Sequence, residues 1–125
     1  MTARDFVKPD YTYRVTVDRV VDGDTVDVLI DVGFKTTVFK RLRLLDLDTE
    51  ELRDSDPARR VKAYEAKERM EALLAEADRV YVQTYLDSTG KYGRLLANIW
   101  VEKDDVLTNV NSQMVEEGFQ KEPKA

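Results

Sequence analysis

Three short clusters of polar residues carry side chains that could do chemistry, and the first spans Asp22, Gly23 and Asp24. The two carboxylates stand two positions apart, so on an extended segment they project from one face about 7 Å from each other. Gly23 lets the backbone bend between them. Taken alone, the pattern is more typical of an Asp-Gly turn between strands than of a ligand site. An EF-hand loop that opens at Asp22 is excluded, because its last ligand position falls on Gly33 and not on a glutamate.

The second cluster follows an apolar run at residues 41–47. Arg43 precedes Asp48 by five positions, and Glu51 follows Asp48 by three positions. Thr49, between the two acids, adds a hydroxyl and a carbonyl oxygen. The simplest interpretation is a solvated acidic loop whose charges pair with arginines at the surface, an arrangement that stabilises a fold very little. A chemical role would need partners from elsewhere in the chain.

The third cluster is the sequence GKYGR at residues 90–94. Two glycines flank Lys91 and Tyr92, and Arg94 stands at the start of the apolar run that follows. On its own, this segment is most simply a hairpin loop with a few basic side chains.

Brought together, the three clusters contain the parts of a site for phosphodiester hydrolysis. Asp22, Asp24 and Asp48 could surround a hard divalent cation, and their oxygen atoms suit calcium. Arg43 and Arg94 could each bind a phosphate through two parallel hydrogen bonds. Negative charge develops on the phosphate oxygens during the reaction, and such donors together with a cation would stabilise it.

Glu51 is the residue expected to act as the general base that activates water. The chain contains no cysteine and no histidine. This composition excludes disulfides, zinc sites built from Cys and His, thiol nucleophiles and an imidazole base. A glutamate is therefore the natural base for this site.

The elements that must position these clusters follow from apolar periodicity. Apolar residues alternate with period two before residue 47 and again after residue 79, which predicts strands. Asp56 and Pro57 suit the N-cap and first position of a helix whose apolar residues recur on one face. The expected elements are strands at 11–21, 26–32 and 38–45, a helix at 57–78, strands at 80–85 and 94–100, and a helix at 108–118 capped by Thr108.

The order β-β-β-α-β-β-α predicts a mainly β, α+β fold: a five-stranded OB-fold barrel with a helix at one end. We expect one domain over residues 1–125, with its core at 11–119 and flexible ends at 1–10 and 120–125. The net charge of −5 argues against a nucleic-acid binder that relies on overall attraction, so any phosphate contact should be local. No membrane-spanning run or signal peptide is visible, which predicts a cytoplasmic protein unless a longer precursor is trimmed. We also expect a monomer.

The three clusters, in this order around a long helix, resemble the motifs of the staphylococcal (micrococcal) nuclease family, the thermonuclease-like domain, across residues 13–119. The family's Asp-Gly-Asp-Thr stands at residues 22–25. Its arginine, followed five positions later by Asp-Thr-Pro-Glu, stands at Arg43 and residues 48–51. Its Lys-Tyr-Gly-Arg stands unchanged at residues 91–94.

The resemblance implies an OB-barrel endonuclease that uses calcium to hydrolyse DNA and RNA and leaves 3′-phosphate ends. It also implies a role for each matching residue. These are Asp24 and Asp48 as calcium carboxylates, Asp22 as a nearby acid acting through water, Thr49 as a carbonyl ligand, Glu51 as the general base, Arg43 and Arg94 as phosphate-binding catalytic residues, and Lys91 and Tyr92 as contacts to a terminal phosphate.

Three departures from the family pattern bear on these roles. Glu50 replaces the family's proline and places a second carboxylate beside Glu51, although only Glu51 has the matching offset from Asp48. Asp46 adds a negative charge near the expected cation. The chain ends soon after Gly118, so the family's C-terminal helix and later tyrosines are missing, which predicts weaker, salt-sensitive substrate binding.

The alternative is a non-catalytic OB-fold module that binds single-stranded nucleic acid or a protein partner. Such modules offer aromatic side chains on which bases stack. Tyr11, Tyr13, Tyr81 and Tyr85 could supply them, although tyrosines at strand positions more often pack in a core or at its rim. Cleavage of nucleic acid would distinguish the two functions.

Overall fold

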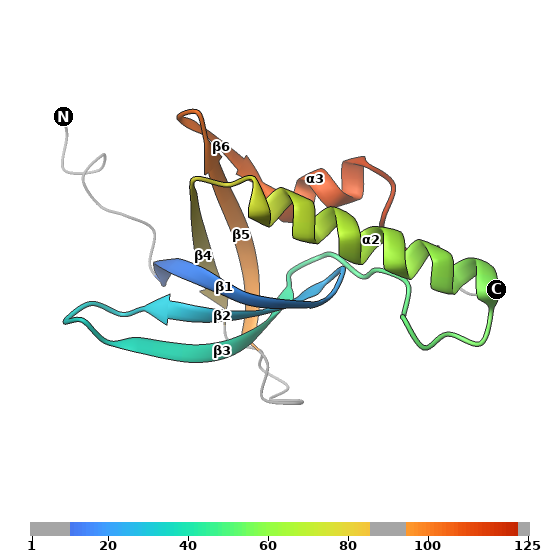
Figure 1. The fold of residues 1–125 in the computed structure, drawn as a ribbon, viewed down its shortest axis with the longest axis horizontal. Coiled ribbons are helices and arrows are strands. Elements are labelled where there is room, and N and C mark those ends of the chain that lie inside the picture. Colours follow the sequence, from blue (N-terminus) through green and yellow to red (C-terminus); the bar gives the residue numbers. More distant parts are fainter. Residues whose placement is uncertain (1–10, 86–94, 123–125) are drawn as a thin grey trace.

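A computed structural model of the protein describes residues 11–85 and 95–122 and shows a strongly curved sheet with both helices on one side (Figure 1). The order of strands and helices expected from the sequence is confirmed, with one short strand added. The described elements are β1 (Thr12–Asp22), β2 (Thr25–Asp31), β3 (Thr37–Leu44), α2 (Pro57–Ala75), β4 (Arg79–Tyr85), β5 (Leu95–Lys103), β6 (Val106–Asn109) and α3 (Val110–Glu116).

The first five strands close into a barrel. β1 pairs with β2 and with β4, β2 with β3, and β4 with β5, all in antiparallel orientation. A parallel pairing of residues 42–44 in β3 with residues 95–97 in β5 joins the two open edges. This closed, five-stranded arrangement with a helix between β3 and β4 is the OB-type barrel that the sequence predicts.

Two β-bulges shape β1, the strand that leads to the first acidic cluster. The register with β2 shifts between Val17 and Arg19 and again between Val20 and Asp22. A bulge adds one residue to one strand and increases its twist. The first bulge reverses the alternation of side chains, so Val15 and Val20 are both buried although they stand five positions apart. The second bulge lies directly before Asp22.

The strand β6 corrects the sequence-based prediction, which placed the start of a helix at Thr108. β6 pairs with β5 across a tight turn at Asp104 and Asp105, whose φ angles are 51° and 63°. Turns of this kind usually contain Asn-Gly or Asp-Gly, so an Asp-Asp pair is a weak hairpin signal. The N-cap lies one residue later than expected, because the Asn109 side chain caps the helix by accepting the Ser112 N–H at 3.0 Å.

The helix α2 begins where the sequence predicts and ends three residues earlier. The Asp56 side chain accepts the Ala58 N–H at 2.9 Å, and a proline takes the first helical position. The predicted helix to residue 78 is too long, because the Asp78 N–H instead donates to the Glu102 carbonyl in β5 at 2.8 Å as the chain enters β4. The buried face of α2 consists of Ala63, Ala66, Met70 and Leu74.

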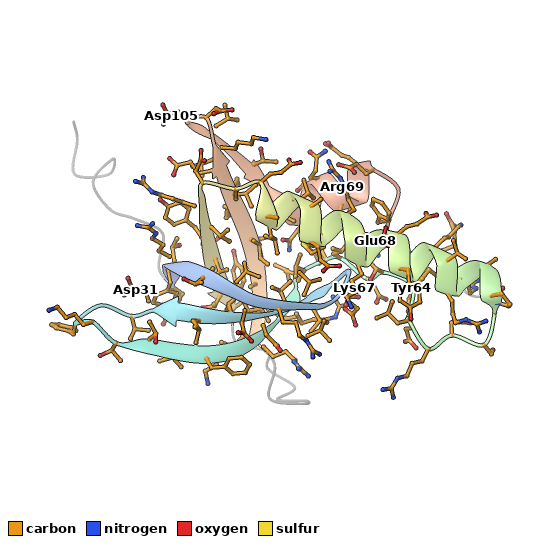
Figure 2. All side chains as sticks on the ribbon, viewed as in Figure 1. Asp31, Tyr64, Lys67, Glu68, Arg69 and Asp105 are labelled. Carbon is orange, nitrogen blue, oxygen red and sulfur yellow. The ribbon has the colours of Figure 1, made fainter. Side chains whose placement is uncertain are left out.

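An ion pair joins α2 to the end of α3. Arg69, which Figure 2 shows on the side of α2 toward α3, donates to the Glu117 carboxylate at 2.6 and 3.0 Å. The Gln113 side chain donates to the same carboxylate at 2.6 Å. These hydrogen bonds, with that from Arg69 the stronger influence, lower the pKa of Glu117. Within the described part of the chain, neither helix is long and apolar enough to cross a lipid bilayer.

Candidate functional site

The predicted site residues that the structure describes gather around one open cavity of about 650 Å³. It lies where the ends of β1 and β3 meet the loop at residues 45–53. The predicted residues that line it are Asp22, Asp24, Arg43, Asp48, Thr49 and Glu51. The other predicted residues, Lys91, Tyr92 and Arg94, lie outside the described residues. The lining also includes Glu50, noted above as a departure from the family pattern, and residues with no role predicted from the sequence, namely Arg19, Val21, Thr25, Leu52 and Arg53.

Asp24 is a buried carboxylate whose two oxygens are both hydrogen-bonded. Oδ2 accepts the Thr49 backbone N–H at 3.0 Å, and Oδ1 accepts the Thr25 hydroxyl at 3.0 Å. Burial raises the pKa of Asp24 from 3.8 to about 6, with further contributions from hydrogen bonding to Asp22 and repulsion by it. Arg43 and the Thr49 N–H oppose this shift without cancelling it. The protein therefore holds the Asp24 anion in surroundings that favour an additional positive charge.

Arg43 bridges two carboxylates at the edge of the cavity. Its Nη2 lies 3.3 Å from Asp24 Oδ2 and 3.0 Å from Asp48 Oδ1. Its Nη1 donates to the Leu44 carbonyl at 3.0 Å and also to the Leu47 carbonyl. Leu47 and Asp48 belong to the loop that follows β3, and Asp24 lies in the turn between β1 and β2, so the Arg43 guanidinium holds the loop against that turn. The side chain nevertheless stays 21% exposed.

Asp48 is held by residues from the far end of the chain. Lys121 Nζ lies 3.3 Å from Asp48 Oδ2, and the Lys121 backbone N–H donates to the Asp48 carbonyl at 2.8 Å. The Asp48 N–H in turn donates to Gln120 Oε1 at 2.9 Å. The sequence carries no signal for these contacts, because Asp48 and Gln120 stand 72 positions apart.

Gly23 and Thr49 pack against α2 at the base of the cavity. A Cβ atom at Gly23 would lie 2.7 Å from Ala66 Cβ and 2.9 Å from Thr49 Oγ1, closer than such contacts allow. A glycine is therefore required at position 23 because Ala66 and Thr49 lie so close to its backbone, and not only because the chain turns there. Thr49 is 2% exposed, and its hydroxyl has no hydrogen-bond partner among the described residues.

Glu50 and Glu51 have opposite surroundings. Glu50 is 7% exposed, and both of its carboxylate oxygens accept from Arg59 Nη1, at 3.0 and 3.2 Å. Glu51 is exposed and lines the cavity, and its carboxylate makes no hydrogen bond or ion pair with the described residues. The Glu50 carboxylate is thus buried and engaged by Arg59, whereas the Glu51 carboxylate is open to the cavity. Of the two neighbours, Glu51 is thus the one available as a base.

Asp46 does not line the cavity. Its φ is 59°, a left-handed conformation that aspartate tolerates better than most residues. Its side chain is exposed and borders a neighbouring hollow, which shares Arg43 and Asp48 with the cavity. The extra negative charge noted in the sequence is therefore not among the groups that line the cavity.

Within residues 11–85 and 95–122, no three acidic side chains are grouped closely enough to hold a metal ion. Asp22 and Asp24 interact with each other, as the pKa of Asp24 reflects. Asp48 instead binds Arg43 and Lys121. The geometry therefore shows a cavity lined by acidic and basic side chains, in which the Glu51 carboxylate has no partner among the described residues.

Much of this chain is similar in sequence to known proteins. The family described as Staphylococcal nuclease homologue matches residues 41–123. Protein ParB of Escherichia coli is 36% identical over 111 residues, which cover 85% of this chain and 55% of that protein. The micrococcal nuclease of Shigella flexneri is 32% identical over 112 residues, 86% of this chain and 56% of that protein. Endonuclease YhcR of Bacillus subtilis (strain 168) is 30% identical over 112 residues, 86% of this chain and 9% of that protein. The chain spans about half the length of the first two relatives and a small part of the third.

Proposed function

The chain belongs to the staphylococcal nuclease family, and from that premise we propose that it is a calcium-dependent nuclease that hydrolyses the phosphodiester bonds of DNA or RNA. The observation that carries the proposal is the free, exposed carboxylate of Glu51 in the same cavity as Arg43 and Asp24. Two of the similar proteins, the micrococcal nuclease and Endonuclease YhcR, carry nuclease names.

The residues at the cavity fit calcium by their chemistry. All of their candidate ligand atoms are oxygens, which calcium prefers, and a chain without cysteine or histidine offers no site for softer metals. The raised pKa of Asp24 supports a cation there, because a nearby positive charge would favour the ionised carboxylate. The buried Thr49 hydroxyl, unpartnered among the described residues, is a further oxygen at this point. Asp22, Asp24, Asp48 and the Thr49 carbonyl would hold the ion, and because these aspartates do not form a grouped site among the described residues, they would have to draw together around it.

Glu51 would take the proton of the attacking water. The water oxygen forms a bond to phosphorus as its proton passes to a Glu51 carboxylate oxygen. The bond from phosphorus to the 5′ oxygen breaks, and that oxygen leaves as a hydroxyl after protonation. The products carry a 3′-phosphate and a 5′-hydroxyl. Bound calcium would supply positive charge for the phosphate oxygens.

Arg43 would donate hydrogen bonds to the phosphate, since a guanidinium presents paired N–H donors that match two phosphate oxygens. It already stands at the cavity and is partly exposed there. Arg94 would act as a second such donor, and Lys91 and Tyr92 would bind a terminal phosphate. Those three assignments rest on the Lys-Tyr-Gly-Arg motif in the sequence.

Cleavage of single-stranded DNA and of RNA, each with calcium and with a chelator, tests the proposal. We expect the wild-type protein to cleave at least one substrate at low salt with calcium only, and Glu51→Gln and Arg43→Ala to lose that activity. The products should end in 3′-phosphates. No cleavage of either substrate at high enzyme concentration would overturn the nuclease assignment. Binding without cleavage would identify the protein as a non-catalytic OB-fold module, and 3′-hydroxyl ends would overturn the mechanism.

A further inference from the structure

The outer face of β3 carries a line of side chains that starts at the cavity. Arg43, Arg41 and Phe39 alternate with inward positions such as the buried Leu42, so all three project from the same face of the strand. Successive members of this line lie about 7 Å apart along the strand. Arg43 borders the cavity, and Phe39, at the other end of the line, is 53% exposed.

A row with net positive charge crosses this line. Asp27 of β2 stands opposite Arg19 of β1 and opposite Arg41 of β3. Arg41 donates to the Asp27 carboxylate at 2.7 and 3.1 Å and remains 47% exposed. The hydrogen bond from Arg41, together with the charges of both arginines, lowers the pKa of Asp27 and keeps it ionised. One carboxylate thus faces two guanidinium groups, and Arg19 also lines the cavity.

An apolar pair lies next to this row on the side away from the cavity. Leu29 of β2 stands opposite Phe39 of β3, and the two are 37% and 53% exposed. Figure 1 shows the hairpin of β2 and β3 extending away from both helices. An aromatic ring and a leucine thus face solvent together, beside a row with net positive charge on an otherwise acidic protein.

We propose that this surface, made of Arg19, Arg41, Leu29 and Phe39 and called here the β3 track, binds single-stranded nucleic acid that extends from the cavity. Phosphates lie against Arg19 and Arg41, and a base stacks on Phe39 with Leu29 at its edge. The surface combines positive side chains, which suit the phosphates of a single strand, with an aromatic ring on which a base can stack. The proposal rests on the nuclease function proposed above and extends the substrate contact beyond the cleaved bond.

Charge and continuity favour a nucleic acid over a protein on this surface. The arginines stand between the apolar pair and the cavity, so a strand whose phosphate occupies the cavity meets them next. A single strand fits better than a duplex, because a base must leave its stack to lie on an aromatic ring. The track also explains how a chain with a net charge of −5 could hold a polyanion: the attraction is local.

Binding in a chelator tests the track without any cleavage. The probe is a fluorescent oligothymidylate of about 12 nucleotides, a length within the site sizes of OB folds. We expect Phe39→Ala to weaken binding at least about fivefold, the loss of one stacked base. The matched control is Tyr64→Ala on α2, labelled in Figure 2, since Tyr64 is also 53% exposed. It should leave the affinity unchanged.

A second variant tests the phosphate contacts. Arg19→Gln should lower the slope of log affinity against log salt by about one phosphate contact, while Phe39→Ala leaves the slope unchanged. Equal affinity of wild type and Phe39→Ala would overturn the track. Equal weakening by Tyr64→Ala, or equal binding of a duplex of the same length, would overturn it as well. Failure of the wild type to bind the oligonucleotide at low salt would also do so and would leave a protein partner as the occupant of this face.

Cleavage separates this inference from the proposed function. With calcium, Phe39→Ala should raise KM for the long oligonucleotide and leave the cleavage of a dinucleotide unchanged, because a dinucleotide does not reach Phe39. Wild type that binds the oligonucleotide through Phe39 but cleaves nothing would refute the nuclease function and keep the track. Cleavage of both substrates with equal KM in wild type and Phe39→Ala would keep the nuclease and refute the track.

Discussion

Arg59 holds Glu50 through one guanidinium nitrogen, Nη1, which lies 3.0 and 3.2 Å from the two carboxylate oxygens. Arg59 stands in the first turn of α2, so the pair fixes the loop that carries Glu51 to the start of the helix. The resemblance to the family implies a proline at this position, and in this chain an ion pair to α2 is found there instead. Of the two adjacent glutamates, Glu50 therefore has a structural role, and Glu51 remains open to chemistry.

Substitution of each glutamate should separate these tasks. Glu51→Gln should lower kcat by about 10²- to 10⁴-fold, the usual contribution of a general base, with little change in the free energy of unfolding. Glu50→Gln should keep most of the activity and lower the free energy of unfolding by about 1–2 kcal/mol, because a charged hydrogen bond to Arg59 is lost. Cleavage assays and urea unfolding of both variants check this. Loss of cleavage in a folded Glu50→Gln protein, with Glu51→Gln active, would reverse the assignment.

The stability of the calcium-free protein should fall as pH rises through about 6, the raised pKa of Asp24. A carboxyl whose pKa is higher in the folded state than the unfolded value of 3.8 stabilises the fold fully below that value, and the contribution is lost above about pH 6. The loss amounts to at most about 3 kcal/mol for a shift of this size. It is measured as the difference in unfolding free energy between wild type and Asp24→Asn across this range. An identical pH profile for the two proteins would show that another group titrates.

Calcium should raise the midpoint of thermal unfolding, and more at pH 8 than at pH 5. A ligand that binds only the folded state stabilises it by mass action, and protons compete with calcium for Asp24 at the lower pH. Asp24→Asn should lose most of the shift. Asp46→Asn is the matched control, because Asp46 lies outside the cavity, and it should keep the shift. The absence of any shift in wild type at millimolar calcium would count against the cation site.

Gly23→Ala should lower the free energy of unfolding by about 1–3 kcal/mol, as overpacking typically does. The added methyl group would fall 2.7 Å from Ala66 Cβ, on the buried face of α2. Ala66→Gly removes that Cβ, so in the double variant the two losses should sum to less than their separate values. A double-mutant cycle from urea unfolding measures this coupling. Strict additivity would mean that Thr49, and not Ala66, limits the space at Gly23.

Most of the fold could be predicted because its signals are local. Alternating apolar residues define the five barrel strands, and the Asp56 cap defines the start of α2. The strand β6 escaped prediction because it is four residues long and its turn lacks a glycine. The bulges in β1 were also hard to predict from the sequence, since each is defined only by the register with the neighbouring strand.

The sequence by itself determined which side chains could form a site: their types, order and spacing name Asp24, Arg43 and Glu51 without any coordinates. The tertiary structure alone decided their surroundings, namely that Asp24 is buried, that Arg43 bridges two aspartates, and that Glu50 is engaged while Glu51 is free. It also placed the buried Asn111 side chain where it donates to the Leu45 carbonyl at 2.9 Å and so supports the site loop. The physical reason is that pKa, burial and pairing depend on groups from different elements, here the β1–β2 turn, β3, the loop after it and α2, which only folding brings together.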